Sequence, residues 1–152
     1  MGDSTYLKRM KILCVEDDEV ARDALVTVLK RRSCRVYAGA DGEEGLELYR
    51  KYKPDIILVD MLMPNMSGTE LIENIRRECG DEKLAVIVVS ALTDSGSIIN
   101  AVDAGIDKYI TKPVDIDELL SALEEQAEAI YNQKYVTAVS YTHLTLPTIC
   151  SV

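Results

Sequence analysis

The sequence has no tryptophan and no phenylalanine, and its eight aromatic residues are all tyrosines. Its core therefore has to be built from Val, Ile and Leu, which favours packed aliphatic layers. The single histidine, His143, argues against a histidine-based zinc site and against a serine–histidine–aspartate triad. Four cysteines show no CxxC spacing, so they are interpreted as free thiols in a reducing cytosol. They are Cys14, Cys34, Cys79 and Cys150.

Positive charge is also scarce, because 17 Lys and Arg stand against 26 Asp and Glu, a formal net charge of −9. An acidic surface repels phosphate backbones and anionic membranes, so we expect neither nucleic acid nor a membrane as a direct partner. The longest apolar stretch, 84–92, is too short to span a bilayer, and residues 1–11 carry no apolar signal region. A length of 152 residues suits one domain, which we expect to be cytoplasmic.

Five short apolar runs alternate with stretches whose apolar residues recur with a period near 3.6. The runs are 11–15, 34–38, 55–59, 84–89 and 108–111. Strands and helices that alternate at this spacing form βαβ units with a parallel sheet. The second and fifth runs are mixed in polarity and are predicted to be edge strands, whereas the other three are apolar almost throughout. The prediction is an α/β fold: a doubly wound, flavodoxin-like five-stranded parallel sheet of order 2-1-3-4-5, with helices on both faces.

Residues 135–152 differ from the rest, because they contain no Asp, Glu, Lys or Arg. They read YVTAVSYTHLTLPTICSV, with β-branched residues but no helical period. We expect a domain over 1–134, with its core at about 8–131. The end is interpreted as a non-native or disordered tail that resembles read-through from a truncated gene, with an added or swapped edge strand as the alternative. On the first interpretation the natural chain continues past about residue 134.

Polar side chains follow four of the five predicted strands. Glu16 and Asp17 follow the first strand, Asp60 the third, Ser90 the fourth and Lys112 the fifth. In the order 2-1-3-4-5 the first and third strands are neighbours at the switch point, where ligands bind beyond the carboxyl ends of strands. The sequence therefore predicts three carboxylates in one crevice, with the serine and the lysine to one side.

Carboxylates held together above an apolar sheet repel one another and need a cation. Oxygen ligands without Cys or His suit a hard ion and predict Mg²⁺. Lys112 adds a positive charge for an anion and Ser90 adds a hydroxyl donor, which equips the site for phosphoryl transfer onto a carboxylate. The alternative is that acidic residues after a strand only stabilise the next helix N-terminus, a role we expect for Asp18 and Glu19.

With these residues the chain resembles the response regulator receiver domain of two-component signalling, over about residues 8–131. The resemblance rests on KILCVEDDE, PDIILVDMLMPNMSG, VIVVSA and DKYITKP, in the family's order and spacing. It implies that Asp60 accepts a phosphoryl group from a sensor histidine kinase or a histidine phosphotransfer protein. It also implies that Asp17, Asp60 and the main-chain carbonyl of Leu62 bind Mg²⁺ directly, with Glu16 acting through water.

The resemblance further implies a switch between the site and the surface. Lys112 would pair with the phosphoryl oxygens, and its peptide bond to Pro113 would be cis. Ser90 would bond the phosphoryl group, and Tyr109 would change rotamer. The change would reach an output domain or protein on the face formed by the fourth helix, fifth strand and fifth helix. The resemblance is also compatible with a homodimer.

Leu62 and Leu92 stand two positions beyond Asp60 and Ser90. In this family the side chains at those positions border the path of the attacking water. Two leucines are therefore expected to hinder hydrolysis and to give a long-lived phosphoryl group.

Three other functions are compatible with parts of this pattern. A flavodoxin-type cofactor carrier needs a hydroxyl-rich phosphate loop after the first strand, where this chain has EDDE. An aspartate-nucleophile phosphatase has a DxD pattern at its nucleophile, in which the second Asp is the general acid and base. In this chain Leu62 occupies the position of that second Asp. A phosphorylation-independent interaction module stays the main alternative, although the complete acid, Ser and Lys set counts against it. We expect that the protein is not an enzyme and catalyses only its own phosphorylation and dephosphorylation.

Overall fold

The computed structural model describes residues 6–32, 35–80 and 83–133. The predictions for the tail at 135–152 and for Cys34, His143 and Cys150 lie outside these residues.

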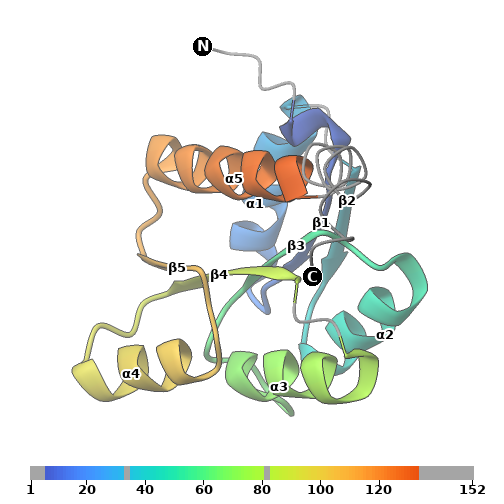
Figure 1. Cartoon of the computed structure of the whole chain (residues 1–152). Helices are drawn as coiled ribbons and strands as arrows, with labels where there is room; N and C mark the ends of the chain where they lie inside the picture. Colours follow the sequence, from blue (N-terminus) through green and yellow to red (C-terminus); the bar gives the residue numbers. More distant parts are fainter. Residues whose placement is uncertain (1–5, 33–34, 81–82, 134–152) are drawn as a thin grey trace, which may run out of the picture.

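The described strands form one parallel sheet in the order β2-β1-β3-β4-β5 (Figure 1), as predicted. They are β1 (Lys11–Val15), β2 (Arg35–Gly39), β3 (Ile56–Val59), β4 (Ala85–Ser90) and β5 (Lys108–Thr111). β3 and β4 are buried throughout, whereas β2 and β5 each expose residues, because only the central strands have neighbours on both sides and helices on both faces. The predicted edge strands are therefore confirmed.

Helices cover both faces of the sheet. The helices α1 (Glu19–Arg31) and α5 (Ile116–Tyr131) lie on one face, while α2, α3 and α4 lie on the other (Figure 1). The second group spans Gly42–Tyr52, Gly68–Cys79 and Ser95–Asp103. A short 3₁₀ turn, η1 (Leu7–Arg9), precedes β1 and packs against α5. Among the described helices, none combines the length and the apolar character that a membrane crossing requires.

Helix starts are set by local side chains. Each of the five described α-helices begins after a residue whose side chain accepts a hydrogen bond from an N–H of the first turn. These residues are Asp18, Asp41, Ser67, Asp94 and Asp115. The expected capping role of Asp18 is thereby confirmed, with Ala21 as the donor. The caps follow the ends of β1, β2, β4 and β5 after short loops, whereas a longer loop separates β3 from the cap Ser67.

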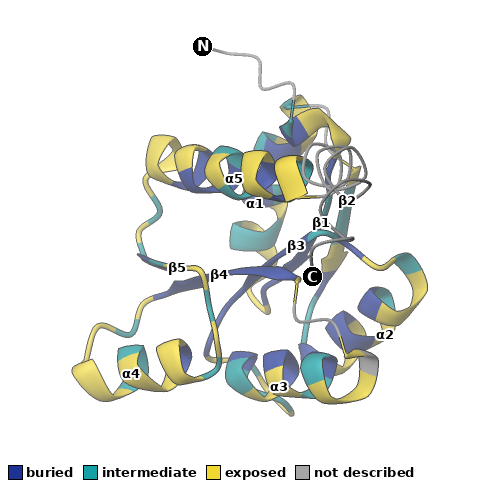
Figure 2. Ribbon diagram, in the orientation of Figure 1, coloured by how far each residue is buried: buried dark blue, intermediate teal, exposed yellow. Residues whose placement is uncertain are grey.

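The core consists of two aliphatic layers, one on each side of the sheet (Figure 2). Successive residues of β1 point to opposite faces, so Ile12 packs under α1 and α5 while Leu13 packs under α2 and α3. Tyr49 is the one aromatic side chain among the fully buried described residues. Apolar strands covered on both faces leave the polar residues at the strand ends as the place for chemistry.

Candidate functional site

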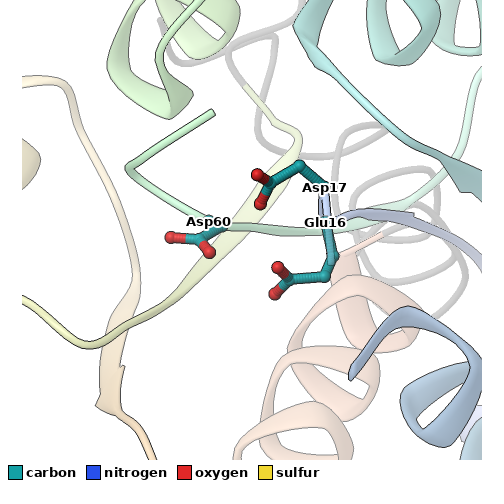
Figure 3. A group of neighbouring side chains, drawn as sticks. All are labelled: Glu16, Asp17 and Asp60. Atoms are coloured by element: carbon teal, nitrogen blue, oxygen red, sulfur yellow. The ribbon is translucent and has the colours of Figure 1, made fainter. Parts of the chain in front are cut away.

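Three carboxylates gather at the carboxyl ends of the neighbouring strands β1 and β3. The ladder pairs Val15 with Val59, so Glu16, Asp17 and Asp60 follow the last paired residues of the two strands. One carboxylate oxygen of each lies within 4.8 Å of those of the other two (Figure 3). The crevice predicted from the strand order is therefore present in the fold, with the predicted acidic residues in it.

Two of these carboxylates are buried and one is not. Glu16 is 2% exposed and Asp60 is 7% exposed, whereas Asp17 faces solvent. Burial raises the pKa of the Glu16 carboxyl, and the nearby Asp60 charge adds to this, although the hydrogen bonds from Lys112 and the Asp18 N–H act in the opposite direction. Negative charge at this site is thus held at a cost, which a cation reduces.

Lys112 provides one positive charge inside the cluster. Its Nζ donates to Glu16 Oε1 at 2.8 Å and to Asp60 Oδ2 at 2.9 Å. Burial alone lowers the pKa of this amine, but the two hydrogen-bonded carboxylates outweigh that effect and the pKa is raised. The Lys112 ammonium therefore stays charged and can attract an anion that approaches the acidic residues. The peptide bond between Lys112 and Pro113 is cis.

Ser90 and Tyr109 meet at one residue, Leu92. The Ser90 side chain is fully buried, and its Oγ accepts a hydrogen bond from the Leu92 N–H at 3.1 Å. The half-buried Tyr109 donates its hydroxyl to the Leu92 carbonyl at 2.6 Å. Ser90 ends the strand next to β3, and the two hydrogen bonds to Leu92 link the end of β4 to β5.

The loop after β3 shapes the surroundings of Asp60. The Leu62 N–H donates to Asp60 Oδ1 at 3.1 Å, and the Leu62 side chain is 59% exposed. Gly68 approaches so closely that a Cβ there would lie 2.4 Å from the Asp60 carbonyl oxygen. Sequence reasoning did not single out this glycine, although it closes the quoted stretch PDIILVDMLMPNMSG.

A second residue that sequence reasoning missed is Arg22, on the first turns of α1. Its Nη1 donates to the main-chain carbonyl of Glu16 at 2.8 Å. The only sequence signal is a basic residue shortly after the cap Asp18, which many solvent-facing helices also have.

The donor atoms fit a hard divalent cation. The three carboxylates offer oxygen only, which suits Mg²⁺. The nearest sulfur on the strand, Cys14, is buried, and burial together with the Glu16 charge raises its pKa to about 12, so it remains a thiol and is a poor metal ligand. The residues present thus agree with the predicted magnesium site.

Comparisons with known proteins agree with this geometry. A family model described as the response regulator receiver domain matches residues 12–124, a range that includes Glu16, Asp17, Asp60, Ser90 and Lys112. The chain is 40% identical over 115 residues to the transcriptional regulatory protein CseB of Streptomyces coelicolor, which covers 76% of this chain and 46% of that protein. This chain therefore spans about half the length of the curated relatives it matches.

Solved structures are similar over most of the chain. A CheY-like response regulator receiver domain protein from Methanospirillum hungatei superposes with a TM-score of 0.76 at 28% identity, covering 81% of this chain and 97% of that one. The CheX–CheY–BeF₃–Mg²⁺ complex from Borrelia burgdorferi gives a TM-score of 0.70 at 26% identity, covering 76% and 87%.

Proposed function

This chain belongs to the response regulator receiver domain family, and on that premise we propose that it takes a phosphoryl group onto Asp60 in a two-component phosphorelay. The observation that carries the proposal is the convergence of the Glu16, Asp17 and Asp60 carboxylates with the Lys112 ammonium. A nucleophilic carboxylate, further oxygen ligands and a fixed positive charge are what acyl phosphate formation requires.

In the proposed reaction a carboxylate oxygen of Asp60 attacks the phosphorus of a phosphohistidine, on a sensor histidine kinase or a histidine phosphotransfer protein. The O–P bond forms as the P–N bond breaks, and the electron pair of that bond returns to the imidazole nitrogen. A small acyl phosphate serves equally, with its carboxylate as the leaving group. Lys112, which bonds Asp60 and Glu16 in the unmodified protein, turns to the new phosphoryl oxygens, and the Ser90 hydroxyl donates to one of them.

Mg²⁺ would be held by Glu16, Asp17, Asp60 and the main-chain carbonyl of Leu62. When bound, it supplies positive charge that offsets the carboxylates and the phosphoryl oxygens. Burial of Glu16 and Asp60 supports this assignment, because in the described part of the chain the two buried carboxylates share a single lysine as their charged partner.

Phosphorylation is proposed to act on partners through the contact of Tyr109 with Leu92. A shift of Ser90 toward the phosphoryl group moves Leu92, which holds the Tyr109 hydroxyl, and so biases the face formed by α4, β5 and α5. An output domain or a separate protein would bind there. On this proposal the protein turns over no separate substrate and catalyses only its own phosphorylation and dephosphorylation. Its proposed location is the cytoplasm.

The test uses beryllium fluoride with Mg²⁺, followed by ¹⁹F NMR, and acetyl phosphate with Mg²⁺, followed by intact mass. We expect the wild type to form the fluoride complex and to gain the mass of one phosphoryl group, and a chelator to abolish both. Asp60→Asn should do neither, while the matched control Asp103→Asn, at the exposed end of α4, should do both. A wild type that forms no complex would instead support the phosphorylation-independent interaction module.

A further inference from the structure

The guanidinium of Arg22 holds the segment that carries two of the three acidic residues. Its Nη1 donates to the main-chain carbonyl of Glu16 at 2.8 Å, and both groups are partly buried. We infer that Arg22 is a positioning residue of the proposed magnesium site, which orients Asp17 without touching the cation itself. This inference rests on the proposed function, because it assigns a role within that same site.

The Asp17 carboxylate depends on the backbone for its orientation. Its side chain is exposed, and among the described residues none donates a hydrogen bond to its carboxylate. The direction of that side chain is therefore set by the backbone on either side. The Glu16 carbonyl and the Asp17 N–H belong to one planar peptide unit, so a bond that fixes the carbonyl also fixes the unit from which the Asp17 side chain departs.

Other contacts fix the neighbouring atoms but not this peptide unit itself. The Glu16 N–H donates to the Gly39 carbonyl at 3.1 Å. The Asp18 N–H donates to Glu16 Oε2 at 3.2 Å, and the Asp18 side chain caps α1. Arg22, which follows on the first turns of α1, completes this set by bonding the carbonyl that lies between the two anchored points.

Arg22 also acts on the site through its charge, and this second effect has the opposite sign. Its positive charge is felt at the end of β1, where it lowers the pKa of the Cys14 thiol against the larger effect of burial. A cation near the carboxylates disfavours a second cation. Removal of Arg22 should thus tighten Mg²⁺ binding if only charge matters, and weaken it if the bond to the Glu16 carbonyl orients Asp17.

Whether removal of Arg22 tightens or weakens Mg²⁺ binding can be measured by calorimetric titration of Mg²⁺ into the full chain. Residues that orient metal ligands typically contribute tenfold to a hundredfold to affinity, and we expect Arg22→Gln to bind Mg²⁺ roughly tenfold more weakly than the wild type. The matched control is Arg31→Gln, which removes the same charge from the exposed last turn of the same helix, about two and a half turns away. Its affinity should equal that of the wild type or be slightly tighter.

Arg22→Lys separates charge from geometry, because it keeps the charge on a shorter side chain with a single-point donor. We expect its Mg²⁺ affinity to fall between those of the wild type and Arg22→Gln. Circular dichroism melts establish that each variant is folded. The inference is overturned if folded Arg22→Gln binds Mg²⁺ as tightly as the wild type or more tightly. Should Arg22→Gln fail to fold, a wild-type affinity in Arg22→Lys overturns it.

Failure of the proposed function gives a different result. In that case the wild type itself shows no Mg²⁺ binding and no beryllium fluoride complex, and the role of Arg22 falls with it. Failure of the inference alone leaves the wild type binding both, with Arg22→Gln indistinguishable from it.

Discussion

Tyr109 donates its hydroxyl to the main-chain carbonyl of Leu92, with 2.6 Å between the two oxygen atoms. The N–H of the same Leu92 donates to the buried hydroxyl of Ser90 at 3.1 Å. One residue of the loop after β4 therefore contacts both a candidate phosphoryl ligand and a half-buried side chain of the edge strand β5. Movement at Ser90 therefore moves Leu92 unless the hydrogen bond between Ser90 and Leu92 breaks.

Tyr109→Phe removes the hydroxyl that anchors the Leu92 carbonyl. We expect a loss of about 1 kcal/mol in the free energy of unfolding, the usual net value of one partly buried hydrogen bond, measured by urea denaturation. The matched control is Tyr52→Phe, since the Tyr52 ring stacks on Tyr37 and no described residue accepts a hydrogen bond from its hydroxyl. Equal stability losses in the two variants would show that the bond to Leu92 contributes nothing specific.

The side chains of Leu62 and Leu92 are predicted to slow hydrolysis of the phosphoryl group. Leu62→Asn places a polar side chain beside Asp60 and should speed loss of the phosphoryl group on the order of tenfold, equivalent to about 1.4 kcal/mol of barrier. Phosphorylated protein freed of donor is followed by intact mass over time. The control Val102→Asn changes an equally exposed residue on α4, since both side chains are 59% exposed. Loss of phosphate from the unpartnered wild type within seconds would refute the prediction.

Gly68→Ala should disturb the backbone of Asp60. The added Cβ would lie 2.4 Å from the Asp60 carbonyl oxygen, closer than carbon and oxygen can approach, so the loop after β3 has to move. We expect a destabilisation of about 1–3 kcal/mol, together with weaker beryllium fluoride binding. In Gly96→Ala, by contrast, the nearest atom to the new Cβ is an Asp94 side-chain oxygen at 3.4 Å, and helix α4 should gain up to about 1 kcal/mol. Unchanged stability in Gly68→Ala would contradict the close approach.

The raised pKa of Glu16 predicts a pH-dependent effect of Glu16→Gln in chelator-treated protein. A folded-state pKa above the ordinary value of 4.5 stabilises the fold below that pH, and the contribution is lost as the pH rises through the folded pKa. At pH 7 the ionised carboxylate is therefore costly, and the neutral glutamine should make the protein more stable. Urea denaturation should show this advantage shrinking as the pH falls toward 4.5.

Glu16→Gln removes the charge of residue 16 while it preserves the hydrogen bonds around Lys112. Glutamine keeps an oxygen acceptor for Lys112, and Lys112 also keeps its bond to Asp60. The control Glu73→Gln removes the same charge from an exposed position in the middle of α3, away from the buried cluster. A Glu16→Gln protein less stable than the wild type at pH 7 would mean that attraction to Lys112 exceeds the cost of burial.

The arrangement of the sheet could be predicted from the chain because its cause is local. Strands covered on both faces are apolar almost throughout, and β1, β3 and β4 show this apart from Lys11 and Ser90 at their ends, whereas the edge strands are mixed. The predicted third strand begins at Asp55, one residue before β3. In the structure the Asp55 side chain instead accepts a hydrogen bond from the Lys11 N–H at 2.9 Å, a contact across 44 positions that periodicity does not report.

The strands, their order and the carboxylates that follow them could be read from the sequence, since alternation of polarity and the position of a residue after a strand are properties of neighbouring residues. The individual bonds among these groups could be seen only in the folded chain. Lys112 reaches Glu16 and Asp60 across 96 and 52 positions, and Arg22 meets a carbonyl oxygen that every residue possesses. Such contacts depend on how α1 and β5 sit against the ends of β1 and β3, and no local pattern encodes a distance between two segments that only the packed core brings together.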